Sequence, residues 1–140
     1  MKKAGLWMAL LLVLLAGCSS KTPKIDAYSW VMTSVQSMDA GGQAVAYGQR
    51  GSSMLEEAKQ VELICEAQGG TLTLTDWTNN RTYTGTYQQS QRDSKSTIYE
   101  VEVEGTSGVA VAAMTTYQDG TQDPTLILNL GDYTVNFFAN

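Results

Sequence analysis

The stretch Thr97-Ile98-Tyr99-Glu100-Val101-Glu102-Val103-Glu104 decides the fold, because apolar and acidic side chains alternate along it. Alternation with a period of two places one face of a β-strand in a core and the other face in water. Tyr99, Val101 and Val103 are therefore expected to point inward, and the three glutamates to face solvent. This one-sided pattern is typical of antiparallel sheets.

The same pattern recurs along the chain, in short segments separated by turn residues such as Gly69-Gly70, Asn79-Asn80 and Gly131-Asp132. The connections are too short for the crossovers that parallel strands need. The sequence therefore predicts an all-β fold, an antiparallel meander of about eight or nine strands that forms a barrel or a sandwich. We expect strands at residues 28–37, 43–47, 60–68, 71–77, 81–89, 97–104, 109–118, 125–130 and 133–138.

Two segments depart from plain alternation. Residues 54–58 follow two serines and could form a single helical turn. Gly85 stands between Tyr83 and Tyr87 in an expected strand, which indicates a bend or a close approach of another backbone.

The N-terminus is basic at Lys2 and Lys3, continues with 11 apolar or small residues from Leu6 to Ala16, and reaches a cysteine at Cys18. An apolar run of this length is too short for a membrane-spanning helix, which needs about 20 residues. The order of features is that of an export signal. The segment Leu15-Ala16-Gly17-Cys18 resembles the lipobox of bacterial lipoproteins. An ordinary secretory signal or a short uncleaved anchor are the alternatives.

The lipobox resemblance implies a division of the chain. Residues 1–17 would be the signal helix, in which Leu15, Ala16 and Gly17 are recognised by the signal peptidase. Cleavage would expose Cys18, whose thiol would carry the diacylglyceryl group. Residues 18–26 would then be a lipidated tether and residues 27–140 a β-barrel-like domain on the extracytoplasmic face of the cell membrane.

Charge restricts the partners of such a domain. Removal of residues 1–17 would take two of the nine basic residues and none of the 14 acidic ones, leaving 7 basic against 14 acidic residues. An acidic chain repels nucleic acid and anionic lipid head groups. We therefore expect no nucleic-acid partner, and attachment to the membrane through acyl chains, of which two suffice.

The chain contains no histidine, which excludes Ser-His-Asp and Cys-His catalysis and imidazole-based metal sites. Cys65 would be the single thiol left after lipidation and is expected to be a small buried residue. The glutamate stripe and the loop Asp119–Asp123 lack the converging oxygens or the EF-hand spacing that calcium needs. We expect no metal, no cofactor and no catalytic residues.

Aromatic side chains could line a pocket at the mouth of a small barrel. The residues that we select for such a ligand site are Trp30, Tyr83 and Tyr87. The alternative for each of them is that it fills the core.

The early strand Tyr28–Val35, the hairpin around Thr82–Tyr87 and the closing Gly131-Asp132-Tyr133 resemble small meander-barrel domains of exported bacterial lipoproteins, including lipocalin-like ones. The chain is also similar to small lipoproteins of Gram-positive gut bacteria. This resemblance implies a location and a shape, but no activity. Where lipocalins have Gly-x-Trp, this chain has Tyr28-Ser29-Trp30.

Three functions remain open at this point, the third of which is a structural or periplasmic-inhibitor role in which only the surface of the domain matters. The first is a lipid-anchored, monomeric, non-catalytic domain at the cell envelope, which binds a small ligand or another envelope protein. The second is an enzyme that acts on glycans with a pair of carboxylates, a chemistry that needs no histidine.

Overall fold

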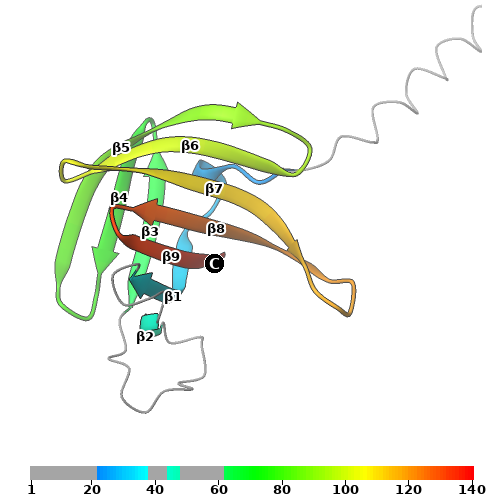
Figure 1. Ribbon diagram of the computed structural model, residues 1–140, viewed down its shortest axis with the longest axis horizontal. Helices are drawn as coiled ribbons and strands as arrows, with labels where there is room; N and C mark the ends of the chain where they lie inside the picture. Colours follow the sequence, from blue (N-terminus) through cyan, green and yellow to red (C-terminus); the bar gives the residue numbers. More distant parts are fainter. Residues whose placement is uncertain (1–21, 38–43, 48–61) are drawn as a thin grey trace, which may run out of the picture.

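Nine strands make up most of residues 22–37, 44–47 and 62–140, which are the residues that the computed structural model describes (Figure 1). All pairings are antiparallel, in the sheet order β2-β1-β3-β4-β5-β6-β7-β8-β9, and each strand from β3 to β8 pairs with the next one in sequence. The strands are β1 (Trp30–Ser37), β2 (Ala44–Tyr47), β3 (Leu63–Gln68), β4 (Thr71–Asp76), β5 (Arg81–Arg92), β6 (Ser96–Val103), β7 (Thr106–Thr116), β8 (Gln122–Leu130) and β9 (Tyr133–Ala139).

The sheet closes on itself through the first and last strands. β1 pairs with β9 from Trp30↔Ala139 to Ser37↔Tyr133, and with β3 at Trp30↔Cys65 and Val31↔Ile64. These pairings close an eight-stranded barrel of β1 and β3–β9. β2 also pairs with β1. It does so at Ser34, Val35 and Gln36, whereas β3 pairs with β1 only at Trp30 and Val31. The predicted all-β meander is thus confirmed, and its form is a barrel rather than a sandwich.

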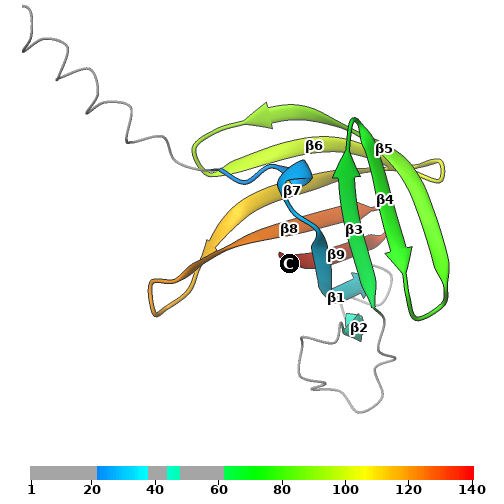
Figure 2. The ribbon, with the colours of Figure 1, turned by 180° about the vertical axis from the view of Figure 1, so that it is seen from behind.

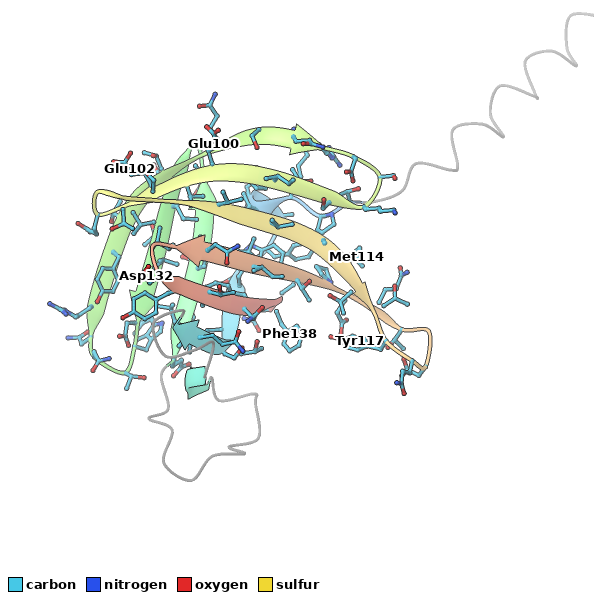
Figure 3. The ribbon with its side chains drawn as sticks, viewed as in Figure 1. Glu100, Glu102, Met114, Tyr117, Asp132 and Phe138 are labelled. Atoms are coloured by element: carbon cyan, nitrogen blue, oxygen red, sulfur yellow. The ribbon has the colours of Figure 1, made fainter. Side chains whose placement is uncertain are left out.

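Alternating side chains fill the barrel as the sequence predicts. Tyr99, Val101 and Val103 are buried, whereas Glu100 and Glu102 point out of the barrel wall into solvent (Figure 3). The core residues with no more than 1% exposure are Ile25, Trp30, Met32, Cys65, Leu72, Ala110, Ala112, Leu126, Leu128 and Phe137.

Tight hairpins set the register between neighbouring strands. Gly69 and Gly70 have φ angles of 57° and 83°, and Glu104 and Gly105 have φ angles of 49° and 80°. Two successive positive φ angles are the geometry of the type I′ turn, whose twist matches that of a two-stranded ribbon. Glu104 therefore belongs to a turn rather than to the strand, and its side chain is exposed to solvent as expected.

Gly85 is a point of close backbone approach, as expected. A Cβ atom here would collide with the main-chain carbonyl oxygen of Glu102 and would lie 2.8 Å from the Cα of Val103. β5 therefore lies against β6 at a distance that only glycine permits.

One end of the barrel, which we call the closed end, carries the turns that follow β3, β5 and β7, and residues 22–27 pack against it. The 3₁₀ turn η1 (Ile25–Ala27) lies across this end beside β3 (Figure 2). Its residue Ile25 has no exposed surface. Thr22, Pro23 and Ile25 are therefore part of the packed structure.

The remaining differences concern strand ends. β5 continues to Arg92, and β8 begins at Gln122, so that Pro124 lies within a strand. Pro124 is tolerated because the registered pairs of β8 with β9 begin only at Thr125. The helical turn expected at residues 54–58 lies outside the described residues.

Candidate functional site

The opposite end of the barrel, which we call the mouth, carries the turns that follow β4, β6 and β8. A pocket of about 560 Å³ opens here. This volume lies in the range of small-molecule sites, roughly 300–1,000 Å³. The apolar lining residues are Val35, Leu63, Leu74, Tyr83, Val103, Leu128, Leu130 and Val135.

The alternation of the strands positions these side chains. Val103 is the last inward residue of β6, while Leu128 and Leu130 are successive inward residues of β8. Leu74 and Leu128 are 5% and 1% exposed and form the floor of the pocket. The pocket is therefore the upper part of the barrel interior, and the core below it is packed.

The rim is polar. Glu104, Thr106, Asp132 and Tyr133 line it, and 52% of the surface of Tyr133 is exposed. A carboxylate oxygen of Glu104 accepts a hydrogen bond of 3.1 Å from the main-chain NH of Thr84. This contact holds the β6–β7 turn against β5.

A second turn of the mouth is braced by its side chains. The carboxylate of Asp76 accepts hydrogen bonds from the main-chain NH and the side-chain amide of Asn79, at 3.0 and 2.7 Å. The main-chain NH of Trp77 donates to the carbonyl oxygen of Glu62 at 2.9 Å. Trp77 itself is 61% exposed, so a hydrogen-bonded turn presents a large aromatic side chain to solvent.

At the closed end the described residues are tied together across the core. The indole of Trp30 and the hydroxyl of Tyr99 both bind the main chain of Ile25, and Thr97 donates to the carbonyl oxygen of Pro23 at 3.1 Å. The depression on this side is smaller, about 360 Å³, and lies outside the barrel between η1 and β3, next to Asp26, Tyr28 and Glu66. Among the described residues, the pocket that extends into the barrel interior therefore lies at the mouth.

Comparisons with known proteins assign no family. No family model, no curated protein and no solved structure matches this chain.

The structure separates the three aromatic residues selected from the sequence. Tyr83 lines the pocket. Trp30 has no exposed surface and belongs to the core of the closed end. Tyr87 packs edge-to-face on Tyr99, with ring centroids 5.8 Å apart. It borders a depression of about 540 Å³ that includes Glu100 on the outside of the wall. Of the three, the pocket therefore contains only Tyr83.

The lipobox residues Leu15, Ala16, Gly17 and Cys18 lie outside the described residues. Within the described ranges, no helix has the length and apolar character to span a membrane. Nor do the described acids and Cys65 form a group of three that could hold a metal ion.

Burial raises the pKa of the Cys65 thiol to about 12, and the neighbouring charge of Glu66 adds to the effect. Burial also raises the pKa of Tyr99. Main-chain NH groups of Lys95 and Ser96 lower the pKa of Asp93, and the hydroxyl and NH of Thr121 lower that of Asp119. None of these four groups lines the pocket.

Sequence reasoning missed most of the pocket. In the sequence, Leu63, Val103, Leu130 and Val135 lie within expected strands, and no pattern marks them as ligand-binding residues. The signal that could have found them is their position, since each is an inward residue close to a turn or strand end at the mouth.

Proposed function

We propose that this protein is a lipid-anchored, non-catalytic domain of the bacterial cell envelope that binds a small apolar ligand in the mouth of its barrel. The observation that carries the proposal is the pocket of about 560 Å³ with its apolar lining. Burial of an apolar molecule there would be favourable by roughly 25 cal/mol per Å² of surface removed from water. The polar rim would orient a polar group of the ligand toward solvent.

The lipid anchor is supported by the sequence. A basic start, a short apolar run and Leu15-Ala16-Gly17-Cys18 form the export signal of a lipoprotein. The acidic balance of the remaining chain makes acyl chains the means of attachment.

The absence of catalysis is supported by chemistry. The chain has no histidine. Strongly perturbed pKa values tend to gather at active sites, and the shifted groups of the described residues lie at the closed end or in the core.

The binding site can be tested with the uncharged dye N-phenyl-1-naphthylamine, whose fluorescence rises in apolar surroundings. We expect saturable binding to the wild-type domain. Leu130→Trp, which fills the pocket, should weaken binding at least about tenfold. Asn129→Trp introduces the same side chain at the adjacent outward residue of β8 and should leave binding unchanged. Thermal melting would verify that both variants fold.

Absence of saturable binding, or equal affinity of both tryptophan variants, would overturn the pocket as the binding site. The competing hypothesis is a carboxylate-dependent enzyme acting on glycans. It predicts hydrolysis of a glycan by the wild-type protein and loss of that activity in Glu104→Gln or Asp132→Asn, the two rim acids.

A further inference from the structure

The chain is fixed to the closed end from Thr22 onward. The Thr22 hydroxyl donates to the carbonyl oxygen of Asp93 at 3.0 Å, and the Arg92 guanidinium donates to the carbonyl oxygen of Thr22 at 3.3 Å. Thr22 is 7% exposed. A chain that enters the domain from an N-terminal anchor therefore reaches the closed end at Thr22.

We propose that the closed end of the barrel faces the membrane that bears the anchor, and that the mouth faces away from it. This inference rests on the lipid anchor at Cys18 proposed above. It adds to the proposed function that the pocket opens on the side of the domain away from the membrane.

The length of the chain decides against the reverse orientation. Four residue steps separate Cys18 from Thr22 and span at most about 14 Å when fully extended. A strand of eight residues such as β6 rises about 26 Å, or about 20 Å along the axis of a barrel with tilted strands. With the mouth on the membrane, Thr22 would lie farther from the surface than its link to Cys18 can reach.

The surface of the closed end is suited to lipid head groups. Tyr28 and Tyr117 are 38% and 37% exposed there, and Tyr117 lies on the β7–β8 hairpin, far from Asp132 at the mouth (Figure 3). Tyrosine is enriched at membrane–water interfaces. Charge is not the driving force, because Lys24, Arg92 and Lys95 at this end are outnumbered by acidic residues, namely Asp26, Glu66, Asp93 and Asp119.

The exposed aromatic side chains alone would favour the mouth as the end that faces the membrane. Trp77 and Tyr133 at the mouth are 61% and 52% exposed, more than the tyrosines of the closed end. The tether outweighs this preference because it sets a covalent limit on distance. Trp77 and Tyr133 are then presented to the aqueous side, and a ligand enters the pocket from water rather than directly from the supporting bilayer.

Fluorescence transfer to the membrane surface tests the orientation. The acylated full-length protein is placed in phosphatidylcholine vesicles that contain a rhodamine-headgroup lipid. A donor dye is attached to one introduced cysteine: Gln118→Cys at the closed end, Gln88→Cys on the wall, or Trp77→Cys at the mouth. Cys65 does not interfere, because it is buried with a pKa raised to about 12.

We expect transfer to decrease in the order 118, 88, 77, with at least about twofold less transfer at residue 77 than at residue 118, given the height of the barrel. Equal transfer at all three positions, or the reverse order, would overturn the orientation while leaving the anchor and the pocket intact. Absence of an acyl mass on the purified protein would instead overturn the anchor, and the orientation with it.

Discussion

The indole nitrogen of Trp30 donates a hydrogen bond of 2.8 Å to the main-chain carbonyl oxygen of Ile25. The main-chain NH of Ile25 in turn donates to the Tyr99 hydroxyl at 3.1 Å. Both backbone groups of Ile25 are thus satisfied in a place that water does not reach, as buried backbone groups must be. Two aromatic side chains of the barrel therefore hold the segment that closes one of its ends.

Trp30→Phe should destabilise the domain. It leaves the buried carbonyl oxygen of Ile25 without a donor and removes part of a fully buried ring, with a combined cost of about 3 kcal/mol. Urea unfolding followed by far-UV circular dichroism measures this change. Trp77→Phe, the same substitution at a residue that is 61% exposed, should change stability by less than about 0.5 kcal/mol. Equal effects of the two substitutions would contradict the role assigned to Trp30.

Gly85→Ala should also destabilise the barrel, by about 2–3 kcal/mol, because the added methyl group meets the backbone of β6 rather than a movable side chain. The same urea titration measures it. Gln88→Ala, on an exposed position of the same strand, is the control and should be nearly neutral. An unchanged stability of Gly85→Ala would show that β5 and β6 can separate without loss.

The strands could be predicted from the sequence because their signals are local. Alternation in Thr97–Glu104 and the glycine pair at 69–70 act within a few residues, and the structure uses both as expected. The closed end could not be predicted in this way. Thr22 forms a hydrogen bond with Asp93, which is 71 residues away in the sequence. No pattern in the short segment around Ile25 predicts that partner.

The pocket shows a second limit of sequence reasoning. Trp30 and Tyr83 both occupy inward positions of their strands, and the alternation treats them alike. Their height within the barrel differs, because it depends on the register of strands that are paired across the whole chain. Trp30 therefore lies in the packed end, whereas Tyr83 reaches the pocket.

Cys18→Ala should abolish attachment to the membrane. The residue proposed to receive the diacylglyceryl group is then absent, so the chain should stay an unprocessed precursor or be released. Fractionation of expressing cells, with immunodetection and mass measurement, tests this. Ser20→Ala, two residues after the cysteine, is the matched control and should remain acylated. A mature, membrane-bound Cys18→Ala protein would contradict the lipid anchor.

Cys65 should make the domain less stable in alkaline solution. Its thiol has a pKa raised by burial from 9.0 to about 12, so the unfolded chain loses this proton at a lower pH than the folded protein does. The contribution of the protonated Cys65 thiol to the free energy of unfolding is fully present below about pH 9. It is lost as the pH rises from 9 to 12, at about 1.4 kcal/mol per pH unit. Urea unfolding at pH 8.5, 9.5 and 10.5 should therefore give a steeper decline for the wild type than for Cys65→Ala. Cys65→Ala should be less stable at every pH because of the cavity that it leaves. The comparison therefore uses only the slope of the free energy of unfolding against pH. Parallel slopes would show that the thiol ionises equally well in the folded barrel.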